Sequence, residues 1–111
     1  MTYHTQMSGD VAKLILKGDF DVFSREEFLG EIDRLMARGA RRLVIDMRRV
    51  PFVSSNGVSA LLGAHVRLRR VGGSVALAHP IREIRETLEL LGLSDRLPVL
   101  DGQEAFGLAQ R

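Results

Sequence analysis

The spacing of apolar residues switches several times between two residues and about 3.6 residues along the chain, which is typical of alternating strands and helices. The segment Val11 to Lys17 predicts a strand, because Val11, Leu14 and Leu16 are apolar, with Ile15 apolar on the other face, and the turn-forming Ser8-Gly9-Asp10 precedes it. Thr2 to Met7 is expected to be its hairpin partner at the edge of the sheet. Gly18 to Asp21 then leaves the strand.

The first helix is expected to begin at Ser24. Ser24 and Glu27 have the spacing of a capping box, in which each side chain accepts a hydrogen bond from the other residue's N–H. Gly39 is expected to end this helix in the left-handed conformation. The apolar residues between these ends have helical spacing and predict one buried face: Phe28, Ile32, Leu35 and Met36.

The middle of the chain predicts a central strand and a second helix. The strand contains Leu43-Val44-Ile45 and ends at Asp46-Met47, and a loop from Arg48 to Val53 follows, where Pro51 prevents a helix. The second helix is expected from about Asn56 to Arg70, and Gly72-Gly73 stops it. Its apolar spacing predicts a buried side of Val58, Leu61, Leu62, His65 and Val66.

The last third of the chain predicts two short strands, each followed by a helix. Ser74 to Ala78 is the first of these strands, and Pro80 is expected to open the third helix, which Gly92 closes. Leu97 to Leu100 predicts the last strand, and Asp101 and Glu104 suggest a capped helix to about Ala109. The buried face of the third helix is expected to comprise Ile81, Ile84, Leu88 and Leu91.

The predicted order is β-β-α-β-α-β-α-β-α over residues 1–111. Successive β-α-β units imply parallel neighbours with right-handed crossovers, whereas the opening hairpin makes the sheet mixed. We therefore expect a single α/β domain, with a mixed sheet of about five strands and about four helices.

Composition removes several classes of function. Cysteine is absent, so disulfides, thiolate metal sites and a cysteine nucleophile are excluded, and no spacing of His, Asp and Glu resembles a metal site. We expect no cofactor. A formal charge of +2 does not indicate nucleic-acid binding. The sequence has neither an apolar run long enough to span a bilayer nor the pattern of a signal peptide, so we expect a cytoplasmic protein without membrane insertion.

The start of the second helix is unusually polar. Ser54, Ser55 and Asn56 follow one another directly, although one such residue suffices to cap a helix. Gly57 in the first turn costs about 1 kcal/mol relative to alanine and would let a partner approach closely. Plain capping explains part of this pattern, and a phosphorylatable serine explains it as well, because a phosphate at a helix N-terminus meets free N–H groups.

The segment Ile45 to Leu62 resembles the signature of STAS domains. It is most similar to the pattern of bacterial anti-sigma factor antagonists, Asp-Leu-x-x-Val-x-Phe-x-Asp-Ser-Ser/Thr-Gly-Leu-Gly-x-Leu. Gly18 to Asp21 resembles the Gly-Glu/Asp-Leu/Ile-Asp of the family, Gly72-Gly73 its glycine turn, and Pro80 to Leu93 its third helix. The resemblance covers nearly the whole chain.

The resemblance implies a protein-binding switch that performs no catalysis. Members of this family bind an anti-sigma factor that is also a serine kinase, phosphorylation of the signature serine ends that binding, and a phosphatase reverses it. The matching serine is Ser55, and Asp19 and Asp21 match acidic residues near the same surface. The implied partner-binding residues are Asp19, Asp21, Ser54, Ser55, Asn56, Gly57 and Ser59.

Three departures from the family pattern keep other functions open. Ser54 replaces the aspartate before the phosphorylated serine and becomes an alternative acceptor, Asn56 replaces serine or threonine, and Val58-Ser59 replaces Leu-Gly. The main alternative is a non-phosphorylated STAS subunit of a lipid-transport ABC complex or of a signalling scaffold. A nucleotide-binding STAS domain lacks support because there is no phosphate loop, and a serine hydrolase because there is no Gly-x-Ser-x-Gly.

Overall fold

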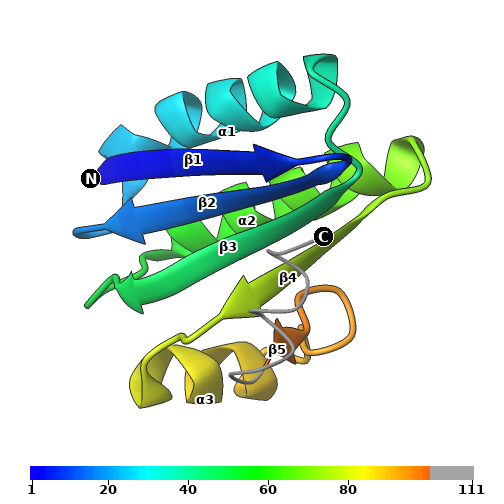
Figure 1. Ribbon diagram of the computed structural model, residues 1–111. Helices are drawn as coiled ribbons and strands as arrows, with labels where there is room; N and C mark the ends of the chain where they lie inside the picture. Colours follow the sequence, from blue (N-terminus) through cyan, green and yellow to red (C-terminus); the bar gives the residue numbers. More distant parts are fainter. Residues whose placement is uncertain (101–111) are drawn as a thin grey trace.

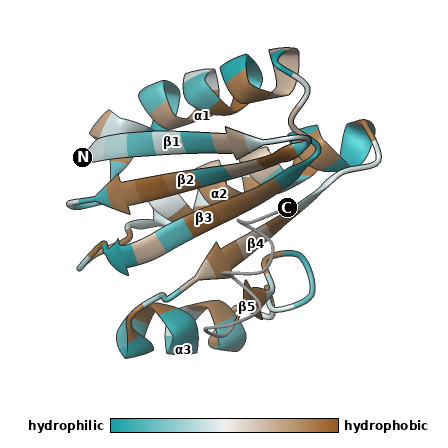
Figure 2. Ribbon diagram, viewed as in Figure 1, coloured by the Kyte–Doolittle hydropathy of each residue, from teal (hydrophilic) through white to brown (hydrophobic). Residues whose placement is uncertain are grey.

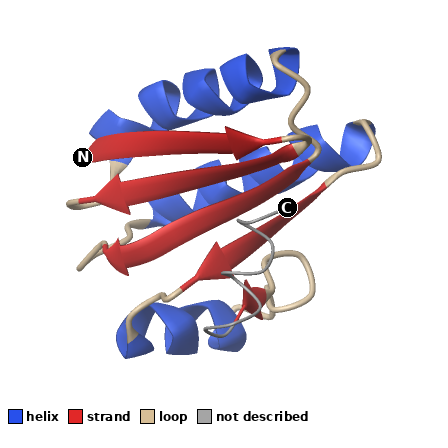
Figure 3. Ribbon diagram, in the orientation of Figure 1, coloured by secondary structure: helices blue, strands red, loops and turns tan. Residues whose placement is uncertain are grey.

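A five-stranded mixed sheet organises the chain, with the strands in sequence order from β1 to β5 (Figure 1). The computed structural model describes residues 1–100. β1 is antiparallel to β2, and every later neighbour is parallel. The elements are β1 (Thr2–Ser8), β2 (Val11–Lys17), α1 (Val22–Ala37), β3 (Arg42–Arg49), α2 (Ser55–Arg70), β4 (Ser74–Ala78), α3 (Arg82–Leu90) and β5 (Val99–Leu100) (Figure 3). The predicted mixed sheet of five strands is confirmed.

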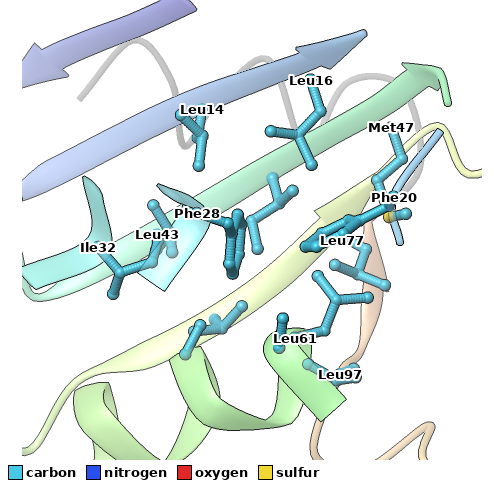
Figure 4. Close-up of a cluster of buried hydrophobic side chains, with 14 of the residues drawn as sticks. Leu14, Leu16, Phe20, Phe28, Ile32, Leu43, Met47, Leu61, Leu77 and Leu97 are labelled. Atoms are coloured by element: carbon cyan, nitrogen blue, oxygen red, sulfur yellow. The ribbon is translucent and has the colours of Figure 1, made fainter. Parts of the chain in front are cut away.

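Helices α1 and α2 lie on the same face of the sheet and enclose the main hydrophobic core with it (Figure 1). β2 to β4 are predominantly apolar, whereas the helices alternate between apolar and polar residues (Figure 2). In the core, Leu14 and Leu16 of β2 face Phe28 of α1 (Figure 4). Among residues 1–100, no helix is both long and apolar enough to cross a membrane.

The start of α1 differs from the predicted capping box at Ser24. The helix begins two residues earlier, and Asp21 is its N-cap, since the Asp21 carboxylate accepts the N–H of Phe23 at 3.1 Å. The Ser24 hydroxyl is turned inward and donates to the carbonyl oxygen of Asp19 and to Oδ1 of Asp21, each at 3.3 Å. At the other end, Gly39 has φ = 100°, which confirms the predicted left-handed cap.

Several expected boundaries and buried positions from β3 onward are wrong. β3 continues to Arg49, where it pairs with Lys17, so the loop after it is shorter than predicted. Val66 is exposed because it lies well off the buried line of α2, which comprises Gly57, Ala60, Leu61, Ala64 and Leu68. α2 itself begins at Ser55, one residue before the predicted start.

The end of the described chain shows a similar shift. α3 begins at Arg82 rather than at Pro80. Leu91 is exposed because the chain turns at Gly92, where φ is 71°, and brings Leu93 into the core instead. β5 is shorter than the expected strand, although Leu97 before it is buried. The helix predicted from Asp101 lies outside the described residues.

The loops that follow β2 and β3 are joined through their backbones. The N–H of Gly18 donates to the carbonyl oxygen of Arg49 at 3.0 Å. The N–H of Phe20 then donates to the oxygen of Phe52, and the N–H of Ser54 to the oxygen of Phe20, each at 2.9 Å. These bonds continue the parallel pairing of β2 and β3 past the ends of the two strands, as far as Phe20 and Val53. The start of α1 therefore lies beside the start of α2.

Gly57 allows α2 to pack against this joined segment. A Cβ at position 57 would lie 2.5 Å from the oxygen of Phe20 and 2.7 Å from Cγ1 of Val53, which is closer than real Cβ atoms come. The space that the sequence suggested for a partner is therefore filled by the carbonyl group of Phe20. Gly57 is buried and sets the distance between the two loops.

Two phenylalanines of α1 provide a matched test of this core. Phe28 is fully buried, with its ring centroid 4.8 Å from that of Phe20, whereas Phe23 is 90% exposed. We expect Phe28→Ala to lower the free energy of unfolding by about 3–5 kcal/mol and Phe23→Ala to change it by less than about 0.5 kcal/mol. Urea denaturation followed by circular dichroism measures both, and equal losses would contradict this packing.

Two glycines test the close approach at the start of α2. We expect Gly57→Ala to destabilise the protein by about 1–3 kcal/mol, because the new methyl group meets the backbone of Phe20. Gly30, inside α1, has no atom within 4 Å of an added Cβ, so Gly30→Ala should stabilise by about 0.5–1 kcal/mol. Opposite signs in chemical denaturation are the expected result, and a stabilising Gly57→Ala would refute the contact.

Candidate functional site

The two neighbouring serines at the start of α2 have different environments. Ser54 is the N-cap, with φ = −80° and ψ = 174°, and its Oγ accepts the N–H of Gly57 at 3.2 Å. Its backbone oxygen accepts the N–H of Val58 at 2.9 Å. The side chain is half-buried and satisfies one of the helix donors that lack a partner within the helix. Ser54 therefore serves the cap.

Ser55 is the first residue of α2 and is exposed. Within residues 1–100, its hydroxyl makes no hydrogen bond to another side chain or to the backbone. A hydroxyl in this position is available to an enzyme from outside, and it lies in the first turn of a helix, where free N–H groups and the positive end of the helix dipole favour an anion. Of the two candidate acceptors, Ser55 is therefore the one with an exposed hydroxyl that the cap does not use.

The two aspartates at the start of α1 are also unlike each other. The carboxylate of Asp21 is bound to the N–H of Phe23 and to the hydroxyl of Ser24, so it holds the helix start in place. Asp19 is exposed and uses its backbone oxygen to accept the hydroxyl of Ser24. No hydrogen bond or ion pair of the Asp19 carboxylate occurs in the described part of the chain. The Asp19 carboxylate is therefore accessible and unengaged, whereas that of Asp21 is occupied by the helix cap.

The bonds through Phe20 bring these residues to one edge of the sheet, beyond the carboxyl ends of β2 and β3. Asn56 and Ser59 are exposed on the side of α2 that faces the start of α1. Together the two helices line an open groove, which comprises Val22, Phe23, Arg25, Glu26, Asn56 and Ser59. All the predicted site residues except the buried Gly57 are thus at least partly accessible at this edge.

Exposed apolar side chains at the same edge were not among the predicted site residues. Phe23 is 90% exposed, and Val22 in α1 and Phe52 in the loop before α2 are each 52% exposed. The signal for Phe23 is present in the sequence, because it lies out of phase with the buried face that begins at Phe28. With Val22 beside it and Phe52 at the same edge, Phe23 is part of a group of exposed apolar side chains rather than a single one.

The chemistry of this edge suits protein recognition. It offers hydroxyl and amide groups for hydrogen bonds, the carboxylates of Asp19 and Glu26, which are unengaged within the described chain, and an exposed aromatic ring. No group of three or more His, Asp or Glu side chains that could hold a metal ion occurs among residues 1–100. Ser55 can accept a phosphoryl group, provided that a kinase supplies the nucleotide and the catalytic base.

Comparison with known proteins identifies the family of the chain. The profile of the STAS domain family matches residues 3–104. BtrV from Bordetella bronchiseptica, whose name gives it provisionally as an anti-sigma factor antagonist, is 30% identical over 94 residues, which are 85% of this chain and 81% of BtrV. The anti-sigma F factor antagonist of Paenibacillus polymyxa is 21% identical over 89 residues, covering 79% of this chain and 76% of that protein.

The fold is also similar to that of the solved anti-sigma factor antagonist SpoIIAA. Its unphosphorylated form superposes with a TM-score of 0.78 at 20% identity, over 98% of this chain and 96% of SpoIIAA. With the family profile matching almost the whole length and BtrV reaching 30% identity, the chain belongs to the STAS domain family, with relatives named as anti-sigma factor antagonists.

Proposed function

We propose that this chain is an anti-sigma factor antagonist that works by exchange of partners. It binds an anti-sigma factor that is also a serine kinase and thereby frees a sigma factor for transcription. Phosphorylation of Ser55 ends the binding, and a serine phosphatase restores it. The proposed partners place the chain in the cytoplasm. The observation that carries the proposal is the exposed hydroxyl of Ser55 at the first position of α2. The neighbouring Ser54 is already engaged as the N-cap of the helix.

The difference between the two serines supports Ser55 as the acceptor. Phosphorylation of Ser54 would put a bulky dianion on the oxygen that accepts the N–H of Gly57, in a half-buried position. Phosphorylation of Ser55 leaves that bond in place. The aspartate that precedes the serine in the family pattern is absent here, but Ser54 supplies an equivalent cap for the helix.

A phosphate on Ser55 would act mainly on the surface. It adds about two negative charges at pH 7 next to the N–H groups of the first turn, which tolerate an anion without unfolding. The exposed carboxylate of Asp19 lies at the same edge of the sheet. A partner fitted to the unphosphorylated surface then meets a more strongly anionic one and dissociates.

Phosphorylation by the cognate kinase tests the acceptor. We expect one phosphoryl group on Ser55 when the purified chain, the anti-sigma factor kinase and ATP are incubated and analysed by mass spectrometry. Ser55→Ala should abolish the label, and Ser54→Ala should keep it, although loss of the cap costs about 1 kcal/mol of stability. Label on Ser54, or no label at all, would refute the assignment.

A charge at position 55 should weaken binding to the kinase without unfolding the chain. We expect Ser55→Asp to raise the dissociation constant at least about tenfold, because an acid at a helix start is tolerated by the fold but not by a partner fitted to the neutral surface. Ser94→Asp makes the same charge change at an exposed position outside the site and should leave affinity within twofold. Titration calorimetry measures both, and equal affinities for wild type and Ser55→Asp would argue against the switch.

A further inference from the structure

Phe23 is the most exposed of the large apolar side chains in residues 1–100, at 90%. Its backbone is held at the start of α1, because the N–H of Phe23 donates to the capping carboxylate of Asp21. The fold does not need the ring, since the core side of the helix is filled by Phe28. An exposed aromatic ring on a rigid helix start is typical of an interface residue, because little conformational entropy is lost when a partner covers it.

The ring lies on the same surface as the proposed acceptor. Phe23 lines one side of the groove, and Asn56, the residue next to Ser55, lines the other. A kinase that transfers a phosphoryl group to Ser55 must reach its hydroxyl within hydrogen-bonding distance. A specific interface covers about 800 Å² of each partner, equivalent to a disc about 16 Å in radius. An enzyme seated on Ser55 therefore also covers the groove and Phe23.

We infer that Phe23, with Val22 beside it, is the apolar anchor by which this chain docks on its anti-sigma factor kinase. The inference rests on the proposed function and deepens it. The complementary site on the kinase is an apolar pocket that takes the phenyl ring. Arg25 and Glu26 line the same groove as Phe23. The inferred pocket on the kinase is therefore bordered by a carboxylate that pairs with Arg25 and a cation that pairs with Glu26.

This arrangement separates attachment from regulation. Burial of the ring supplies affinity that does not depend on the state of Ser55, because the side chain carries no charge. A phosphate on Ser55 then adds a dianion at the margin of an apolar contact, where removal from water is costly unless a cation compensates. The same docked complex can thus form, be phosphorylated and separate.

The test compares two equally exposed apolar residues. Phe23→Ala should raise the dissociation constant for the purified kinase by about 30-fold or more in calorimetry, as expected of a central anchor. Phe23→Leu should restore most of the affinity, because it keeps an apolar side chain. Leu90 is 88% exposed at the end of α3, on a different side of the molecule (Figure 1), and Leu90→Ala should leave affinity within twofold. The urea denaturation of Phe23→Ala should match that of wild type.

The outcomes distinguish this inference from the proposed switch. If Phe23→Ala binds as wild type does while Ser55 is still phosphorylated, the anchor is wrong and the switch stands. If Phe23→Ala weakens binding but the kinase never labels Ser55, the switch is wrong and the anchor stands. An equal loss in Leu90→Ala would overturn the anchor, and a kinase that does not bind the wild-type chain would overturn both.

Discussion

The backbone of Phe20 holds together the edge of the sheet that carries the candidate site. Its N–H donates to the carbonyl oxygen of Phe52 and its oxygen accepts the N–H of Ser54, so one residue ties together the loops after β2 and β3. Gly57 lies directly against the same oxygen. The Phe20 ring is buried in the core and packs at a tilt against Phe28, so the residue that joins the two loops is itself anchored. Two helix starts far apart in the sequence are thereby held side by side.

Capping divides the residues of this edge into two groups. Asp21 caps α1 and Ser54 caps α2, and both side chains are engaged with backbone donors. Val22 and Phe23 follow the first cap and Ser55 follows the second, and all three side chains are exposed in the first turn of their helix. The proposed recognition and modification groups are thus presented by rigid elements, which keeps the entropy lost on binding small.

The sequence predicted the order of the elements well, because the periodicity of apolar residues is strong. It predicted helix boundaries and burial less well where one residue could take either of two roles. Ser24 and Glu27 have capping-box spacing, yet Asp21 caps the helix. Its carboxylate accepts the N–H of Phe23, so the helix begins before Ser24. Leu91 has helical spacing with Leu88, yet it is exposed because Gly92 turns the chain. Ser55 rather than Ser54 was predicted as the acceptor from its register in the signature and its place at the helix start. The structure adds that the Ser54 hydroxyl is engaged in the cap, whereas the Ser55 side chain is exposed.

The sequence by itself determined that this chain is an α/β domain with a polar helix start at residues 54–57, because period, turn residues and cap residues are local properties. It also matched that segment to the STAS signature. Only the tertiary structure decided that Gly57 faces the Phe20 carbonyl rather than open space, and that Phe23 shares a groove with Asn56. Those facts depend on hydrogen bonds between residues more than thirty positions apart, which no local pattern encodes.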